Sequence, residues 1–233
     1  MIYAIESYDT TTVRASVGNY LISKYISAHC DSKVIFNGDG ADEVMGGYLY
    51  FHKCPNELEF DQECRRLVNN IHTFDVQRSD RSISSNGLEP RTPFLDRGFV
   101  QAYFSLPANV RYFPNKEGQR EKYIIRKIFE EDRLLPTDIL WRAKEAFSDG
   151  VSSQNNSWYS IIAKRLENVA LVDSCMYQFN IPSTREEKYY RKIFDGRFEG
   201  CSSMIPYFWM PRYVNATDSS ARTLDVYNEN MPG

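Results

Sequence analysis

Apolar residues recur at helical spacing along most of the chain. After Thr10-Thr11-Thr12, a spacing of four residues predicts an N-capped amphipathic helix from Thr10 to about Cys30, with an apolar stripe of Val13, Val17, Leu21 and Tyr25. Similar patterns predict further helices near residues 41–50, 58–71, 99–104, 122–131, 137–142, 158–169 and 186–194. The chain is therefore predicted to be rich in helix.

One short apolar run has a different pattern. Lys33-Val34-Ile35-Phe36 stops abruptly at Asn37-Gly38-Asp39-Gly40, which predicts a buried parallel strand that delivers a loop at its carboxyl end. Residues 80–96 are rich in Ser, Gly and Pro and are predicted to be irregular, and the tail from about residue 222 is predicted to be frayed. Because a single strand cannot form a sheet, we expect a helix-rich α/β domain whose other strands lie elsewhere.

Composition and charge narrow the class of protein. The 233 residues suffice for one domain, with 28 basic and 31 acidic residues giving a net charge of −3. This balance offers no general attraction to nucleic acid or to anionic lipid, and no apolar run is long enough to span a membrane. The five cysteines are scattered without disulfide or zinc spacing, so we expect a reduced, intracellular protein.

The strongest local motif follows the predicted strand. Gly38 and Gly40 permit a sharp turn and a close approach to a ligand, and the helix that follows offers free N–H groups to phosphate. Asp39, Asp42 and Glu43 place three carboxylates within five positions, which suits a magnesium ion beside a nucleotide. The spacing fits equally well a simpler role for Asp39 and Asp42, as helix caps that complement the helix dipole.

Three weaker motifs also carry candidate residues. Lys144 follows a segment of interleaved cations and aromatic residues and could serve a polyphosphate, although a solvated helix end explains the same pattern. Glu89 and Arg91, held between prolines, could line a pocket or form a structural ion pair. Thr11 and Arg14 share one face of the first helix, and Arg14 could bind a carboxylate substrate or pair with an acidic residue of the protein.

Taken together, these segments resemble the asparagine synthetase family. The matching segments are Tyr8–Ser16, Gly38–Glu43 with Gly47-Tyr48, Gly87–Asp96, Lys144–Gly150, and a tail of eukaryotic type at Trp209–Arg212 and Asn215–Leu224. The resemblance runs in order through almost the whole chain. It implies a partial ATP-pyrophosphatase-like domain, with a Rossmann-like parallel sheet that lacks its first strands.

The resemblance also implies a reaction and a set of site residues. In this family ATP adenylates the side-chain carboxylate of aspartate, and ammonia, produced from glutamine by a separate glutaminase domain, then displaces AMP to give asparagine. Carried over by position, Asp39 and Lys144 would be catalytic and Asp42 would bind Mg²⁺. ATP would contact Asn37, Gly38 and Gly40, and the substrate would contact Thr11, Arg14 and Glu89.

Several departures from the family pattern bear on function. Asn37 replaces the usual serine, and Asp39 replaces a common glutamate. The chain has no Ser-Gly-Gly-x-Asp-Ser loop for pyrophosphate, and Ile2 occupies the place of the glutaminase cysteine. We therefore expect the C-terminal part of a cytoplasmic synthetase that is inactive alone and pairs with the N-terminal part or with a second copy. The alternative is an inactive fragment that acts as an interaction or regulatory module.

Overall fold

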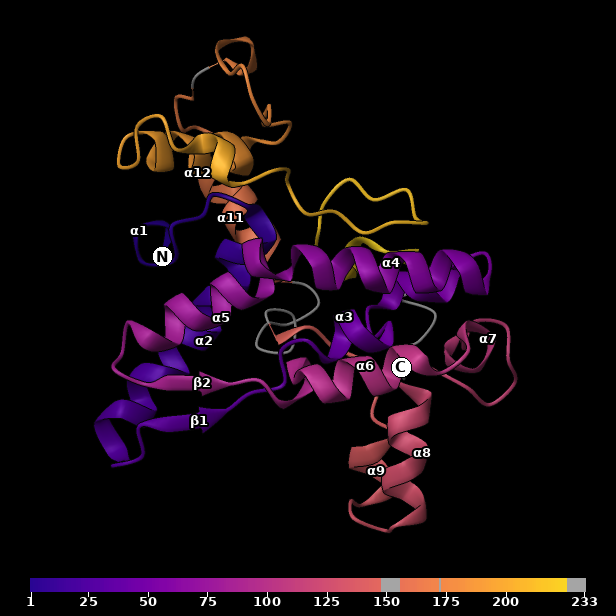
Figure 1. Ribbon diagram of the computed structural model, residues 1–233. Coiled ribbons are helices and arrows are strands. Elements are labelled where there is room, and N and C mark those ends of the chain that lie inside the picture. The colour runs from indigo at the N-terminus through magenta and orange to yellow at the C-terminus, as the bar shows by residue number, and fades with distance from the viewer. Residues whose placement is uncertain (148–155, 172, 226–233) are drawn as a thin grey trace.

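A computed structural model describes residues 1–147, 156–171 and 173–225 (Figure 1). Within these residues the chain is mostly helical, with a small parallel sheet, and this confirms the predicted helix-rich α/β class. The helices are α1 Ile2–Ile5, α2 Thr10–His29, α3 Ala41–Met45, α4 Glu57–Asn70, α5 Asp75–Ser84, α6 Arg97–Ser105, α7 Ala108–Arg111, α8 Tyr123–Glu131, α9 Thr137–Leu140, α11 Trp158–Leu166 and α12 Arg185–Asp195. None of the described helices combines the length and the apolar character that a membrane span requires.

The sheet consists of β1, Val34–Phe36, and β2, Glu89–Arg91, paired in parallel with Val34 opposite Glu89 (Figure 1). The predicted strand and its parallel pairing are confirmed, but its predicted burial is wrong, because Val34 is 48% and Phe36 is 79% exposed. β2 lies in the stretch predicted to be irregular, so the expectation of a single strand is also wrong. Pro90 hid β2 from pattern analysis, since proline occurs in sheets mainly on edge strands.

The start of α2 is fixed by a long-range contact. The cap is Asp9 and not one of the threonines: its carboxylate accepts from the Thr12 N–H at 2.8 Å and from the Thr12 hydroxyl at 2.7 Å. Its other oxygen accepts from the backbone N–H of Trp209 at 2.7 Å. The C-terminal part of the chain is thus fastened to the helix start, beside the residues that begin the candidate site.

The contact between α2 and α5 does not follow the predicted apolar stripe. Leu21 and Tyr25 are 59% and 62% exposed, although the spacing predicts that they are buried. The two helices lie against each other (Figure 1), and the side chains they bury include small hydroxyl residues, Ser16 and Ser23 on α2 and Ser79 and Ser82 on α5. Small side chains allow close approach of two helices, and serine spacing is not an apolar pattern, so sequence analysis missed both this contact and α5 itself.

The other predicted helices agree with the structure, with one division. The helix predicted over 41–50 ends at Met45, because Gly46 adopts a left-handed φ of 62°, and a 3-10 turn at Leu49–Lys53 follows. At the other end of the chain, Ala221–Thr223 form a 3-10 turn and Leu224 is buried. The rest of the tail predicted to be frayed, residues 226–233, lies outside the described residues.

The main core lies between α4 and the returning C-terminal segment. Its buried members come from the 3-10 turn after α3, from α4, from the region around α7 and from the chain beyond residue 208, and include Tyr50, Phe51, Phe60, Leu67, Phe113, Trp209 and Leu224. A second core joins α1 and α12, and a third packs α3 on α6. α3 is thus held firmly at the junction where the loop after β1 ends.

Candidate functional site

The loop after β1 turns back on itself and places two carboxylates. Asn37 holds the loop, since its N–H donates to the carbonyl of Arg91 at 2.9 Å and its amide donates to Ser79 Oγ at 2.5 Å. Asn37 Oδ1 in turn accepts from the N–H of Asp39 at 3.1 Å. Gly40 then begins α3 with a φ of 91°, and an added Cβ there would collide with Leu95. Asp39 and Asp42 therefore leave the loop from a rigid turn.

Asp42 joins two lysines from distant segments. Lys122 Nζ lies 2.7 Å from one carboxylate oxygen of Asp42, and Lys144 Nζ lies 2.9 Å from the other. All three side chains are at most 20% exposed. Burial acts to raise the pKa of Asp42, but the charges of Lys144 and Lys122 outweigh it and hold that pKa well below its usual value. Asp42 is therefore ionised, and it holds two ammonium groups side by side.

Asp39 is paired with a cation from α5. Arg78 Nη2 lies 3.1 Å from Asp39 Oδ1 and 2.9 Å from Asp75 Oδ1, so this one guanidinium connects two carboxylates. Arg78 Nε is buried and has no hydrogen-bond partner among the described residues. A donor in this position is available to a ligand, because leaving it unpaired in the protein interior is unfavourable.

The hydroxyl of Tyr48 connects two carboxylates, those of Glu43 and Asp75. This hydroxyl donates to Glu43 and lies 3.3 Å from Asp75 Oδ1, and Lys144 Nζ lies 5.8 Å from the centre of the Tyr48 ring. Burial raises the pKa of Glu43 well above its usual value, and the nearby charges of Asp75 and Asp42 add to this effect. Glu43 is thus a buried acid that Tyr48 contacts, and among the described residues it belongs to no group of three side chains placed to share a metal ion, as its spacing with Asp39 and Asp42 had suggested.

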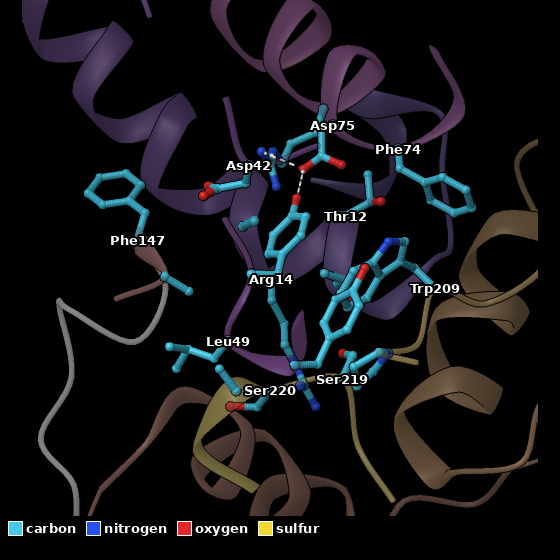
Figure 2. Close-up of a pocket in the computed structure, with 18 of the residues that line it drawn as sticks. Thr12, Arg14, Asp42, Leu49, Phe74, Asp75, Phe147, Trp209, Ser219 and Ser220 are labelled. Carbon is cyan, nitrogen blue, oxygen red and sulfur yellow. Dashed lines mark hydrogen bonds and ion pairs between the residues drawn. The ribbon is translucent and has the colours of Figure 1, made fainter. Parts of the chain in front are cut away.

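One cavity of about 200 Å³ is lined by most of these side chains, namely Asp39, Asp42, Tyr48, Asp75, Arg78 and Lys144 (Figure 2). Lys122 and Glu43 do not line it. Asp39, Asp42 and Lys144, named as the central candidates from sequence, all line it. In Figure 2 Asp42 and Asp75 lie at one end of the cavity, Ser219 and Ser220 lie at the other, and Trp209 forms a side wall. The cavity is therefore built from segments far apart in the chain, and it brings carboxylates and cations together within a partly apolar enclosure.

The two candidates on α2 differ in their surroundings. Thr11 lines the cavity, and its hydroxyl oxygen is buried without a hydrogen-bond partner among the described residues. Arg14 also lines the cavity, but its guanidinium is already held by Glu186 at 2.5 and 3.0 Å and by Asp218 at 2.6 and 2.9 Å. Arg14 therefore pairs with acidic residues of the protein, as its alternative interpretation predicts, and these pairs leave little of it for a substrate.

The remaining candidates lie away from the cavity wall. Glu89 forms an ion pair of 2.5 Å with Arg91, and both side chains are more than half exposed, which agrees with the structural alternative for this pair. Asn37 and Gly40 are occupied in shaping the loop, as described above, and Gly38 has open space where a side chain would be. Of the three predicted nucleotide contacts, Gly38 alone leaves room for a ligand at its Cα.

Sequence analysis missed several residues of the site. Asp75 and Arg78 are on α5, and Lys122 precedes α8, where none of them belongs to a motif. The one local signal for these residues was the spacing of Asp75 and Arg78, since an acidic and a basic residue three positions apart can pair on a helix. The predicted turn at residues 148–150 of the Lys144 motif lies outside the described residues.

Comparisons with known proteins place this arrangement in a family. The asparagine synthase profile matches residues 1–61 and 53–203. The chain is 50% identical over 232 residues to a chicken protein, 48% over 234 residues to a rat protein and 47% over 234 residues to a human protein, each named asparagine synthetase [glutamine-hydrolyzing]. Each match covers 97% of this chain, and the chain spans 41% of the length of these relatives, at their C-terminal end. The chain therefore belongs to the asparagine synthase family.

Proposed function

We propose that the cavity binds ATP and aspartate and that the chain takes part in the ATP-dependent conversion of aspartate to asparagine. The observation that carries this proposal is the pairing of Lys144 with Asp42 on the wall of a cavity that Asp39 also lines. Lys122, which does not line the cavity, holds the other oxygen of Asp42. The names of the relatives point to the same reaction. In the proposed scheme, a side-chain oxygen of aspartate attacks the α-phosphorus of ATP, and pyrophosphate leaves as β-aspartyl-AMP forms.

The lysine pair suits the first step. Negative charge accumulates on the departing pyrophosphate, and fixed cations in a site with little water stabilise such charge strongly. Asp42 raises the pKa of Lys144 in spite of its burial, so this ammonium group stays charged. Lys144 would stabilise the α-phosphate and the leaving group, and Asp39 would assist formation of the adenylate. In the second step, the nitrogen of ammonia attacks the acyl carbon, and AMP departs with the bonding electrons.

Aspartate would use two of the buried polar groups that lack hydrogen-bond partners among the described residues. The Thr11 hydroxyl and Arg78 Nε are both buried, both unpaired among the described residues and both on residues of the cavity wall. A hydroxyl and a guanidinium N–H are suitable donors for a carboxylate oxygen. We therefore propose Thr11 as a substrate contact and Arg78 as its neighbour, whereas Arg14 supports the wall through Glu186 and Asp218.

The donor set also fits Mg²⁺ that arrives with ATP. The described residues contain no group of three or more His, Cys, Asp or Glu placed to hold a metal, so this part of the chain offers no complete cage. Mg²⁺ at nucleotides is commonly bound by one or two carboxylates together with phosphate oxygens, and Asp42, on the cavity wall, can supply a carboxylate. The ion would neutralise phosphate charge. Asp42 would bind the ion with one of the two carboxylate oxygens that now pair with lysines.

A chimera tests the proposal. The chain replaces the matched part of the chicken relative, and the chimera is incubated with Mg-ATP, aspartate and ammonia. We expect AMP and asparagine in equal amounts, with pyrophosphate release that depends on aspartate. A folded chimera that releases no pyrophosphate would contradict the proposal. The isolated chain should make no asparagine, because no second phosphate-binding loop was found in its sequence.

A second candidate function is that of a non-catalytic interaction module. The observation in its favour is the exposed sheet, where Val34 and Phe36 present apolar side chains to solvent. Its partner would be the rest of a synthetase or a second copy of this chain. Calorimetric titration with Mg-ATP separates the two functions, since a module without catalytic use need not bind nucleotide.

The cytoplasm is the location that we propose for the protein. The five cysteines are all free, which suits a reducing compartment.

A further inference from the structure

Glu121 is a fully buried carboxylate directly before Lys122 in the chain. Three cationic or titratable side chains surround it. Arg120 Nε and Arg126 Nη2 each lie 3.2 Å from Oε1, and His52 Nε2 lies 3.2 Å from Oε2. His52 comes from the 3-10 turn after α3 and Arg126 comes from α8, so Glu121 connects separate parts of the fold.

The two arginines extend this network to the segment before Lys144. Arg120 Nη1 donates to the carbonyl of Trp141 at 2.9 Å. Arg126 Nη1 donates to the carbonyl of Leu140 and, at 3.2 Å, to that of Arg142. Three consecutive carbonyls are thus held by arginines that Glu121 orients, at the end of α9 where it packs against α8 (Figure 1). The backbone that leads to Lys144 is fixed two residues before that lysine.

Lys122 is fixed at the other end of the same network. It follows Glu121 directly, and its backbone has a left-handed φ of 59° at the start of α8. A non-glycine residue holds this conformation only where the surrounding contacts enforce it. Arg126 Nε donates to the carbonyl of Glu121 at 3.0 Å, which closes the turn around Lys122.

We infer that Glu121 is a positioning residue that sets both Lys122 and Lys144 against Asp42. The side chain of Glu121 does not line the cavity, so it acts through the two arginines and the backbone. Its importance for catalysis rests on the proposed function, whereas its hold on the two lysines rests on the geometry alone.

The negative charge of Glu121 is what the network requires. Burial acts to raise the pKa of Glu121, but the hydrogen bond from His52 and the charges of Arg120 and Arg126 outweigh it and lower that pKa. Arg126 is only 12% exposed, so without the carboxylate a buried cation would keep only neutral carbonyl partners and would move toward water. An amide of the same shape would therefore release Arg126, and with it the carbonyls before Lys144.

Amine labelling tests the geometric part of this inference. The full chain and the chimera are treated with a low dose of acetic anhydride, and acetylation is measured by mass spectrometry, with the exposed Lys164 as the internal reference. Lys122 and Lys144 should be protected, because each is held by Asp42. In Glu121→Gln their labelling should rise roughly tenfold. A lysine that loses part of its charge stabilisation has a lower pKa, and a fall of about one in that pKa raises its free-amine fraction about tenfold.

Glu63→Gln is the matched control. Glu63 is also fully buried and also pairs with two arginines, Arg66 at 2.7 Å and Arg212 at 3.0 Å, but neither lysine is among its partners. A general loss of stability would affect both variants, and urea unfolding measures that loss for each. If Glu121→Gln does not fold, Glu121→Asp takes its place, because it keeps the charge and withdraws the carboxylate by one methylene.

The kinetic measurement uses the chimera. Glu121→Gln should lower kcat/KM for ATP in pyrophosphate release by about 10–100-fold, the effect of a small misplacement of catalytic groups. Glu63→Gln should leave it near the unsubstituted value. The effect of Glu121→Gln should also be smaller in a Lys144→Ala background, since the part of the effect that acts through Lys144 is already lost there.

The outcomes separate the two proposals. Selective labelling of Lys122 and Lys144 in Glu121→Gln supports the positioning role, and equal or unchanged labelling in both variants overturns it. If the unsubstituted chimera releases no pyrophosphate, the proposed function fails, yet the labelling still decides what Glu121 does. If the chimera is active and Glu121→Gln affects turnover only in proportion to its folded fraction, Glu121 is a structural residue and no more.

Discussion

Replacing Lys144 by alanine should impair adenylation far more than folding. In the structure, Lys144 Nζ lies 2.9 Å from Asp42, and the two side chains are 16% and 20% exposed. At this distance and an effective dielectric constant near 20, the attraction is about 6 kcal/mol before desolvation is subtracted. Desolvation of both groups cancels most of this attraction. Lys122, at 2.7 Å, also remains to pair with Asp42, so we expect a loss of about 1–2 kcal/mol in the free energy of unfolding.

The expected effect on the reaction is larger because Lys122 cannot replace the lost charge at the same place. Loss of one preorganised donor at developing negative charge typically costs 10²–10³-fold in rate, or about 3–4 kcal/mol. Lys144→Ala in the chimera should therefore lower aspartate-dependent pyrophosphate release by about that factor. Urea unfolding should meanwhile show a small shift of the midpoint with an unchanged slope.

The control is Lys127→Ala, which removes an exposed lysine of α8 paired with Glu130 and should change neither quantity. If Lys144→Ala unfolds the protein and lowers turnover in the same proportion, Lys144 is a structural residue and the proposed mechanism loses its principal cation. If pyrophosphate release is unchanged while the protein stays folded, Lys144 does not contact the phosphates.

Three further changes follow from the same structure. Arg14→Met should lower the free energy of unfolding by about 3–5 kcal/mol in urea titrations, because it leaves the carboxylates of Glu186 and Asp218 without their cation, and a loss below 1 kcal/mol would show that the pairs are dispensable. Burial raises the pKa of Asp9 to about 6, so the folded state binds this proton more tightly than the unfolded state, and stability from this group falls as pH rises between about 4 and 6. The free energy of unfolding of Asp9→Asn, measured relative to that of the unsubstituted chain, should therefore rise by up to about 3 kcal/mol across that window. Urea titrations at several pH values measure this difference, and a difference that does not change with pH would contradict the assignment. Phe36→Ser should reduce self-association of the isolated chain in light scattering, because Phe36 is 79% exposed on an open sheet, and a chain that is already monomeric would contradict this.

Local patterns were sufficient for the elements that bury a simple apolar face or begin with a standard cap. α4, α6, α8 and α12 agree with their predicted ranges to within a few residues, and the loop after β1 follows a short apolar run as expected. α5 and β2 were missed for physical reasons. α5 buries serines against α2, and β2 is the sequence Glu-Pro-Arg, whose strand character comes from pairing with β1 and not from its own residues.

The candidate site was predictable in part. The motif residues Asp39, Asp42 and Lys144 line one cavity, as expected from the motifs that contain them. The partners of these groups could not be predicted. Arg14 finds Glu186 and Asp218 at separations of 172 and 204 residues, and nothing in local spacing indicates a contact over such distances. Lys122 was overlooked for the same reason, since its significance lies in the 80 residues that separate it from Asp42.

The pairing explains how a cavity that we propose to bind phosphates contains several acidic side chains, Asp39, Asp42 and Asp75. Two ammonium groups in a site with little water repel each other, and each would lose its charge or turn outward without a nearby anion. Asp42 removes this difficulty by binding both lysines at once. Arg78 is stabilised in the same way by two carboxylates, those of Asp39 and Asp75. The cations are therefore in place before any ligand arrives, so little of the ligand's binding energy is needed to gather them. Under the proposed function, the carboxylates of this wall are counter-ions, and Lys144 and Arg78 are the cations that phosphate would contact.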